Sequence, residues 1–488
     1  MTTATHTRSP AGTPGSRLAA SLDGRLLTPG DAGYDAARTV WNAMVDRRPR
    51  MIVRAAGTAD VQAAVRHARE HDLEIGVRCG GHNVAGFAVP DDGLMIDLTP
   101  MGGVQVDPER RRARVQGGAL LGALDRATQP YGLATTAGNV SHTGVGGLTL
   151  GGGMGWLARQ YGLACDNVES FTVVTADGEV VTASRTEHPE LFWGLRGGGG
   201  NFGVVTEFEF RLHRTGTRTL VAEFDFRAED AVPVLEGWRD LNAVAPREAS
   251  FSASVADGPA GGGPVATVGF VWVGDPERGR RLLPALRALG RPVATRITTP
   301  SYLELQSRDD SSGGHAYRRY SAAHYLRGFP TSAIEAFLLR GATDLRGTGS
   351  GAGGPGAGLP GGGRPGAGLP GAGLPGVGLQ AHGGAIADVP VDDAAFGHRD
   401  TMFEFGAGSR WTDPAEDDAR MAAARAAGSA LAPYANGVYV NSLAAHDGPR
   451  GIRRAYPAAK LARLAALKGV WDPHNVFHLN QNITPAAP

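Results

Sequence analysis

Cysteine and lysine are scarce in this chain of 488 residues. The two cysteines, Cys79 and Cys165, cannot build a disulfide framework of the kind that staples small secreted domains. The only lysines are Lys460 and Lys468, so arginine carries almost all of the positive charge. The 48 basic residues are balanced by 48 acidic residues and do not cluster, which argues against a nucleic-acid-binding protein.

Long apolar runs are also missing. No window of about 18 apolar residues occurs, so the sequence predicts no membrane-spanning helix. Residues 1–30 lack the apolar stretch of a secretory signal peptide. We therefore expect a soluble, cytoplasmic protein that binds neither nucleic acid nor a membrane. The sequence is silent on the oligomeric state and gives no reason to expect a metal site.

Glycine is abundant, with 73 residues, and its distribution helps to divide the chain. We expect a disordered tail over residues 1–33, a first domain over 34–218 and a second over 219–440. Long alternating segments predict that the second domain is antiparallel α+β. Within it, an imperfect Pro-Gly-Ala-Gly-Leu repeat over residues 347–378 predicts a mobile surface insertion. Residues 441–488 form a C-terminal segment.

Apolar periodicity predicts individual elements around these regions. Thr58–Asp72 has the pattern of a helix with Thr58 as its N-cap, and Arg278–Leu289 has the pattern of a second helix. Glu74–Arg78 and Met402–Phe405 are expected to be strands.

The first chemical motif follows the strand Glu74–Arg78 and reads Cys79-Gly80-Gly81-His82-Asn83. Two successive glycines allow backbone N–H groups to turn into a concavity that can hold a pyrophosphate. His82 would then lie beside the bound group. Taken alone, a histidine after two glycines is more often a structural or surface residue.

Two further glycine-rich segments follow. Gly144–Asn167 indicates close backbone approach to a planar or phosphorylated ligand, although Cys165 in isolation is most simply a buried small side chain. Gly198–Gly203 matches the spacing GxGxxG, but the strand Val204–Phe210 follows it where a dinucleotide fingerprint requires a helix. The sequence therefore does not support a nicotinamide cofactor.

Together with Trp471–Phe477 and Asn480–Ile483, these motifs resemble the berberine-bridge-enzyme-like flavoproteins, a branch of the vanillyl-alcohol-oxidase superfamily. The resemblance covers roughly residues 40–220 and 380–485 in the order of the family. It implies an α+β fold with a two-part FAD-binding domain of the PCMH type and an antiparallel-sheet α+β substrate domain. The C-terminal segment, residues 441–488, would return to complete the FAD domain.

The same resemblance implies FAD held by two covalent bonds. His82 would attach to the 8α-methyl group and Cys165 to ring carbon 6, whereas Cys79 has no covalent role. The other cofactor-binding residues that the resemblance implies are Arg78, Cys79, Gly80, Gly81, Asn83, Gly138, Gly144, Gly147, Gly151, Gly152, Gly155, Asn167, Gly203, Val204, Val205, Asn480 and Gln481.

The catalytic candidates are Glu404, Tyr439 and Ser442. Family members that oxidise sugars carry a Tyr-x-Asn-Tyr segment, in which a tyrosine is the base. Here Ser442 replaces that tyrosine, and a serine cannot act as the same base. Glu404, in the strand Met402–Phe405, is the alternative proton acceptor, and Tyr439 would line the pocket.

Three functions remain open from the sequence. The first is an oxidase that removes hydride from an alcohol or activated C–H bond of a secondary metabolite. In this case hydride passes to flavin N5 and O2 is reduced to H2O2. The second is an oxidative cyclase that forms a C–C or C–O bond, and the third is a flavin-free binding or scaffold protein.

Overall fold

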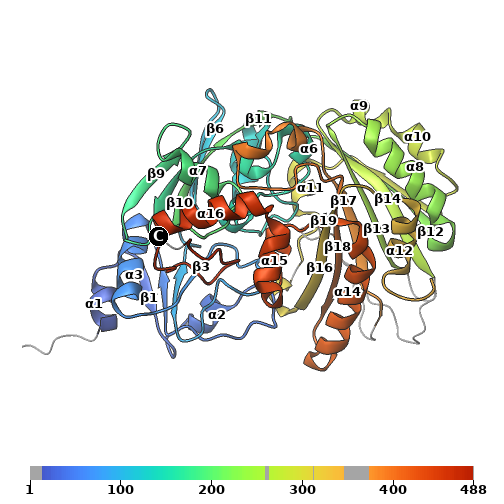
Figure 1. The fold of residues 1–488 in the computed structure, drawn as a ribbon. Helices are drawn as coiled ribbons and strands as arrows, with labels where there is room; N and C mark the ends of the chain where they lie inside the picture. The colour runs from blue at the N-terminus through green and yellow to red at the C-terminus, as the bar shows by residue number, and fades with distance from the viewer. Residues whose placement is uncertain (1–13, 259–262, 312, 346–372, 487–488) are drawn as a thin grey trace, which may run out of the picture.

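The computed structural model describes residues 14–258, 263–311, 313–345 and 373–486. The polypeptide forms an α+β fold in which a four-stranded and a five-stranded sheet lie to one side of a large eight-stranded sheet (Figure 1). No helix of this part of the chain is long and apolar enough to cross a membrane.

The first domain contains the two smaller sheets. In the four-stranded sheet, β2 and β3 run parallel to the central β4, and helix α3 follows β2. Its elements are β1 (Arg25–Leu27), β2 (Met51–Arg54), α3 (Thr58–Glu70), β3 (Ile75–Arg78) and β4 (Leu94–Asp97). The five-stranded sheet is antiparallel and consists, in spatial order, of β5 (Val104–Asp107), β6 (Arg112–Gln116), β10 (Val204–Arg211), β8 (Val168–Val174) and β9 (Val180–Ser184).

Short helices and one small strand pair complete this domain. They are α2 (Tyr34–Arg38), α4 (Leu121–Thr128), α5 (Val145–Leu150), α6 (Ala158–Tyr161), α7 (Pro189–Leu195), and the pair β7 (Leu133–Ala134) and β11 (His213–Arg214). The short α5 lies inside the glycine-rich segment that follows Gly144, so the glycines sit at a loop-to-helix transition.

Two expectations for the N-terminal region are wrong. Residues 14–33 are not a disordered tail, because α1 (Pro14–Ala20) and β1 pack onto the first sheet, with Leu18 and Leu27 buried. The Asp60 carboxylate fixes the connection by accepting hydrogen bonds from two backbone N–H groups between α1 and β1. The N-cap of α3 is Gly57, not Thr58, since the Thr58 hydroxyl faces the hydroxyl of Thr206. Residues 1–13 lie outside the described part.

The second domain is built on the antiparallel eight-stranded sheet, whose order is β15-β12-β14-β13-β17-β18-β16-β19. Its strands are β12 (Thr219–Arg227), β13 (Ala249–Asp257), β14 (Pro264–Val273), β15 (Ala294–Thr298), β16 (Arg318–Leu326), β17 (Gly376–Ala381), β18 (Phe403–Trp411) and β19 (Ala435–Gly437). Helices α8 (Ala231–Val244), α12 (Thr331–Leu339) and α14 (Asp417–Leu431) bury one face. On β18, Phe403 and Phe405 point into that core, so the alternation of a strand turns Glu404 to the opposite face.

The structure corrects two expectations for this domain. The helix expected over Arg278–Leu289 is two short helices, α9 (Pro276–Arg280) and α10 (Leu283–Arg287), because Pro284 lacks the N–H that would continue the first. Residues 347–372 of the expected insertion lie outside the described part. Gly376–Gly378, by contrast, belong to β17, an inner strand whose Val377 is buried. The chain also contains α11 (Tyr302–Ser307) and α13 (Ala385–Asp388).

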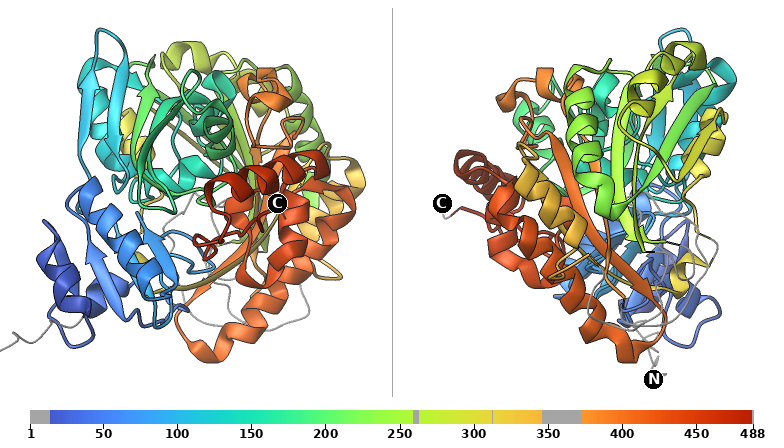
Figure 2. Two further views of the ribbon diagram at one scale, coloured as in Figure 1. Left: turned by 60° about the vertical axis from the view of Figure 1, so that its left-hand side comes forward. Right: turned by 90° about the vertical axis from the view of Figure 1, so that its right-hand side faces the viewer.

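The C-terminal helices lie where the two domains meet. Figures 1 and 2 show α15 (Gly448–Ala455) beside the eight-stranded sheet and α16 (Ala458–Trp471) extending from it toward the first domain. Lys468 is fully buried and donates hydrogen bonds to the Asp472 carboxylate at 2.8 Å, to Asn201 O at 2.8 Å and to Phe477 O at 2.9 Å. This lysine joins α16 to the glycine-rich Gly199–Gly203 segment. Whether the domain boundaries fall at residues 34, 219 and 441 stays a prediction.

We expect Asp472→Ala to lower the free energy of unfolding by ~3–5 kcal/mol, because it leaves the buried Lys468 ammonium without its counter-ion. The matched control is Arg463→Ala on the same helix, which removes an exposed ion pair with Glu190 and should cost less than about 1 kcal/mol. Urea denaturation of both variants measures the difference. Equal, small losses would show that the buried pair does not hold the C-terminal segment in place.

Candidate cofactor and active site

His82 lines a cavity of about 450 Å³. Four segments line it: the loop at 79–83, residues 138–148, the strand entry at 199–205, and the C-terminal residues 477–481. Strands β16 and β18 of the second domain close it from the other side through residues that include Ser321 and Gly408. The cavity therefore lies between the two domains.

The glycines of these segments serve two different purposes. A Cβ atom at Gly80 would lie 2.3 Å from Gly144 N, and one at Gly144 would lie 2.3 Å from Gly80 N. The two loops thus touch backbone to backbone, which only glycine permits. By contrast, the positions where Gly147 and Gly200 would carry a Cβ have no atom within 4 Å. These two glycines leave open space beside the backbone along the cavity.

Several buried polar atoms on the cavity wall lack a hydrogen-bond partner among the described residues. They are Asn83 Oδ1, Asn139 Oδ1, Ser311 Oγ, Arg319 Nη2 and Asn480 Oδ1. Because buried polar groups in folded proteins are almost always paired, their convergence indicates that the cavity holds a polar ligand. A cavity lined by glycine loops and by unpaired donors and acceptors fits the predicted FAD.

His82 is held in a stack of polar and aromatic side chains. Its ring lies parallel to Trp41, with 4.5 Å between ring centroids and 13° between planes. Its Nε2 is 2.7 Å from His142 Nδ1, and its Nδ1 is 3.4 Å from Thr143 Oγ1. Burial lowers the pKa of His82 well below its usual value, with further contributions from His142 and Arg319. The imidazole is therefore neutral and nucleophilic at physiological pH.

The structure does not bring Cys165 into the cavity with His82. Cys165 is fully buried in the core of the first domain, its backbone N–H donates to Gly152 O, and its thiol faces the Asp166 carboxylate at 3.8 Å. Burial and that carboxylate raise the pKa of the thiol far above its usual value. A protonated, enclosed thiol is a poor nucleophile. The expected bond from Cys165 to the flavin ring thus has no support from the geometry.

Cys79 does line the cavity, but it is not an alternative point of attachment. Burial raises the pKa of its thiol to about 11, and Sγ donates to Ala119 O at 3.4 Å. The thiol is therefore protonated and packed against Gly144, which does not favour a covalent bond at this position.

Most of the other expected cofactor-binding residues lie along the cavity. These are Cys79, Gly80, Gly81, Asn83, Gly138, Gly144, Gly147, Gly203, Val204, Val205, Asn480 and Gln481. Their individual contacts with FAD stay predictions.

Five expected residues lie elsewhere, for identifiable reasons. Arg78 donates to Ala37 O, and the Asn167 amide donates to Tyr161 O and Leu163 O within its own loop. A Cβ on Gly151, Gly152 or Gly155 would collide with Asn441, Phe396 or Ala137, respectively, so these glycines permit internal packing.

The three catalytic candidates are placed differently. Tyr439 and Ser442 line the cavity, whereas Glu404 is buried and does not. The Tyr439 hydroxyl oxygen accepts hydrogen bonds from Gly153 N–H at 3.0 Å and from the Asn441 amide at 2.8 Å. Burial, followed by the Glu404 carboxylate, raises the pKa of Tyr439 above its usual value. Tyr439 is thus the titratable candidate that lines the cavity.

Glu404 belongs to a buried polar cluster behind the cavity. One carboxylate oxygen is 3.6 Å from His382 Nε2, and the other has no hydrogen-bond partner among the described residues. The cluster connects to the cavity through Gln380, whose Oε1 accepts from the Asn139 amide at 3.3 Å. Glu404 does not line the cavity, and its expected place over the flavin stays a prediction.

Sequence reasoning missed several residues of the cavity wall. Trp41, Asn139, His142 and Arg319 all line or contact the His82 environment. His142 had a usable signal, since it lies two residues before Gly144, in the approach to the glycine-rich segment. Arg319 had none, because it comes from a strand of the second domain that carries no motif.

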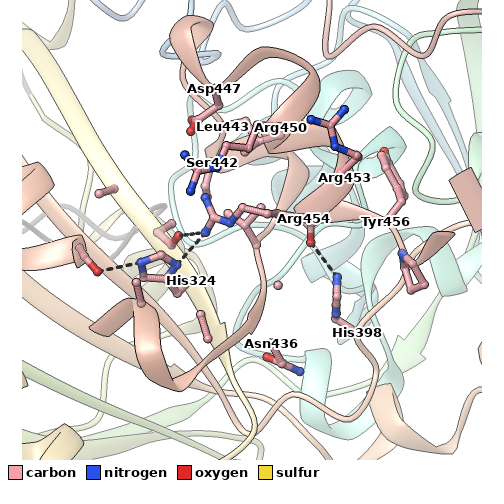
Figure 3. A pocket seen from close by; sticks show the side chains of 18 of the residues that line it. His324, His398, Asn436, Ser442, Leu443, Asp447, Arg450, Arg453, Arg454 and Tyr456 are labelled. Carbon is pink, nitrogen blue, oxygen red and sulfur yellow. Dashed lines mark hydrogen bonds between the residues drawn. The ribbon is translucent and has the colours of Figure 1, made fainter. Parts of the chain in front are cut away.

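A second, larger cleft of about 1380 Å³ adjoins this cavity (Figure 3). Arg454 lies at its centre and donates to His324 Nδ1 at 2.7 Å, while its own carbonyl accepts from His398 Nε2 at 3.0 Å. Arg450 and Arg453 of α15 add two exposed guanidinium groups. The cleft is basic but contains none of the glycine-rich segments, so it does not fit the cofactor. Both cavities share Tyr320, Ser321 and Ser442 as lining residues.

Comparison with known protein families gives two matches. Residues 49–184 match the FAD binding domain, and residues 438–484 match the segment described as berberine and berberine like. The first match contains His82 and Cys165, and the second contains Tyr439, Ser442 and the C-terminal motifs.

Curated relatives and solved structures agree with these matches. The chain is 30% identical to an FAD-linked oxidoreductase of Dictyostelium discoideum over 472 residues, which is 95% of each chain. It is 39% identical to (R)-6-hydroxynicotine oxidase of Paenarthrobacter nicotinovorans over 289 residues, a match that spans 58% of this chain and only 62% of that protein. The crystal structure of 6-hydroxy-D-nicotine oxidase from Arthrobacter nicotinovorans superposes with a TM-score of 0.81 and 28% identity over 96% of this chain and 99% of that one.

One further structure bears on the fold alone. A glucooligosaccharide oxidase from Acremonium strictum superposes with a TM-score of 0.82 at 23% identity, covering 98% of this chain and all of that one. That oxidase is described as having a 6-S-cysteinyl, 8α-N1-histidyl FAD.

Proposed function

The chain belongs to the berberine-bridge-enzyme-like FAD-linked oxidoreductases and is an FAD-dependent oxidase of that family, and on that basis we propose that it oxidises an alcohol or an activated C–H bond of a small secondary metabolite. Dioxygen is the electron acceptor and hydrogen peroxide the second product. The observation that carries the proposal is a single cavity lined both by His82 and by Tyr439. The family assignment leaves no reason to retain the hypothesis of a flavin-free scaffold.

We propose one covalent bond to FAD, through His82, in place of the two that the resemblance implies. A neutral imidazole that lines the cavity supports this attachment, and the enclosed, protonated thiol of Cys165 argues against a second one. The loops at Gly80–Gly81 and Gly144–Gly147 and the C-terminal Asn480 would hold the cofactor. When bound, FAD supplies a two-electron acceptor for hydride.

The phenolate form of Tyr439 is the proposed proton acceptor for the substrate. Its hydroxyl oxygen receives two hydrogen bonds, from Gly153 N–H and from Asn441, and both strengthen when the oxygen becomes anionic. Removing the proton of a substrate O–H or N–H group makes the adjacent C–H bond a better hydride donor. In this proposal Glu404 is not the base, because its carboxylate does not reach the cavity.

We propose that Ser442 sets the width of the cavity and takes no part in proton transfer. It lines both the cofactor cavity and the adjoining basic cleft, so its small side chain leaves room between them. We expect Ser442→Tyr to lower kcat/KM for bulky substrates, relative to small ones, by about tenfold to a hundredfold. The matched control is Ser442→Ala, which keeps the room and should leave that ratio unchanged. Equal loss on large and small substrates in Ser442→Tyr would contradict this role.

The proposed function is tested by incubating the purified yellow protein aerobically with a panel of alcohols, amines and phenolic metabolites. Hydrogen peroxide should form in proportion to substrate, and NMR of the product should show a new carbonyl or imine. A ring in place of that group would identify an oxidative cyclase. Flavin that is reduced by NADH but by no member of the panel would contradict the proposal.

A further inference from the structure

Three side chains form a line that ends on His82. His82 Nε2 lies 2.7 Å from His142 Nδ1, and His142 Nε2 lies 3.9 Å from a carboxylate oxygen of Asp310. Asp310 is itself fixed by Ser141, which donates its N–H at 2.9 Å and its hydroxyl at 2.6 Å to the carboxylate. The line joins two domains, since Asp310 follows α11 whereas both histidines belong to the first domain.

The short contact between the two histidines assigns the proton of His82. Only one of the facing nitrogens can carry hydrogen. His142 Nε2 has no hydrogen-bond partner among the described residues, but the negative charge of Asp310, 3.9 Å away, favours a proton on it. Neutral His142 then presents a lone pair at Nδ1, so His82 donates from Nε2 and keeps its lone pair at Nδ1. That second nitrogen has only the long, 3.4 Å contact with the Thr143 hydroxyl.

From this geometry we propose that His142 is the proton acceptor that enables His82 to form its covalent bond with FAD, and that Asp310 positions and stabilises it. The proposal rests on the proposed attachment at His82. His142 takes the Nε2 proton of His82 while Nδ1 forms its new bond, so no positive charge remains on the alkylated ring. Asp310 stabilises the charge that His142 then carries until a proton leaves to solvent.

The reaction balances with dioxygen as the oxidant. The His82 Nδ1 bond to the 8α carbon forms, while one C–H bond of the 8α-methyl group and the Nε2–H bond of His82 break. Dioxygen accepts the two electrons and the two protons and becomes hydrogen peroxide. This is the same acceptor that the proposed oxidase activity uses.

The surroundings hold the two rings so that this transfer can occur. Trp41 stacks parallel to His82 and lies 4.7 Å from the His142 ring, and the Arg319 guanidinium is 3.6 Å from the Trp41 ring centroid. The buried Arg319 charge also disfavours a proton that stays on either imidazole. The Asp310 carboxylate lies on the side of His142 away from His82. It therefore offsets the positive charge that His142 carries during the proton transfer.

The test measures the rate of covalent flavin attachment and does not depend on substrate turnover. Full-length protein produced in flavin-starved cells is mixed with FAD in air, and acid-precipitable flavin is measured over time by fluorescence. We expect His142→Asn to bind FAD but to attach it at least about a hundredfold more slowly, and added imidazole should restore the rate in His142→Ala. His315→Asn is the matched control, because His315 also contacts Trp41 but does not touch His82. It should attach FAD at the wild-type rate.

The outcomes separate this inference from the proposed attachment. Wild-type protein without acid-stable flavin would contradict attachment at His82. Wild-type protein with acid-stable flavin, together with an unchanged rate in His142→Asn, would overturn only the role of His142. Should His142→Asn fail to fold, Asp310→Asn decides the matter. It should slow attachment to a smaller extent, and a wild-type rate there overturns the proposal.

Discussion

Replacing Tyr439 by phenylalanine is expected to slow substrate-dependent flavin reduction by about 10²–10³-fold, while the protein keeps its covalent FAD. The phenyl ring fills the same space, but it removes the oxygen that Gly153 N–H and Asn441 hold in the cavity. Stopped-flow measurement of flavin bleaching under anaerobic conditions reports this step directly, without contribution from the reaction with oxygen.

The pH dependence of the same step sharpens this prediction. Burial raises the pKa of Tyr439, so the phenol is protonated at neutral pH and its anionic fraction grows as the pH rises. The rate of flavin reduction should therefore increase through the alkaline range in the wild type and lose that increase in Tyr439→Phe. Glu404→Gln is the control for the alternative base. A loss in Glu404→Gln that equals or exceeds the loss in Tyr439→Phe would transfer the role to the carboxylate.

Replacing His82 by alanine is expected to remove all covalently bound flavin. The variant should still bind FAD, because the glycine loops and Asn480 remain, but acid or urea should release the cofactor completely. The matched variant is Cys165→Ser, which should retain acid-stable flavin because its thiol is enclosed in the core. Intact-mass measurement of the denatured proteins distinguishes the two. Flavin mass that persists in His82→Ala, or disappears in Cys165→Ser, would contradict a single attachment at His82.

Much of the fold follows from local patterns of apolar and polar residues in the sequence. The patterns of α3, β3 and β10 predicted elements that the structure contains, with small shifts at their ends. The resemblance of the motifs to the family predicted the α+β architecture and the large antiparallel sheet. The prediction of a disordered N-terminal tail was wrong because the polar composition gives no sign of two contacts that anchor the segment. These are the burial of Leu18 and the hydrogen bonds that the Asp60 carboxylate accepts from the turn before β1.

The candidate site was only partly predictable, and Cys165 shows why. Sequence proximity to a glycine-rich loop says that a residue is near the ligand, but not on which side of the loop its side chain lies. The thiol of Cys165 is enclosed in the core, where its neighbour Asp166 pairs with the buried Arg399. His82, by comparison, follows two glycines whose backbones line the cavity.

Residues that come from the second domain were the hardest to foresee. Arg319 and Asp310 reach the His82 environment from segments more than 200 positions away in sequence, and neither belongs to a motif. Glu404 was predicted on the correct strand, and alternation along β18 does turn it away from the helices. Its contact with His382 and its pairing with Gln380 could not be predicted, because only the packing of the sheet brings these residues together.

We propose that one histidine, and no cysteine, forms the covalent bond between FAD and this protein. Proteolytic digestion of the denatured wild-type enzyme, followed by mass spectrometry of every flavin-bearing peptide, tests it most directly. We expect flavin on the peptide that contains His82, and the unmodified mass for the peptide that contains Cys165. Flavin on the Cys165 peptide would instead establish the two-bond attachment that the resemblance implies.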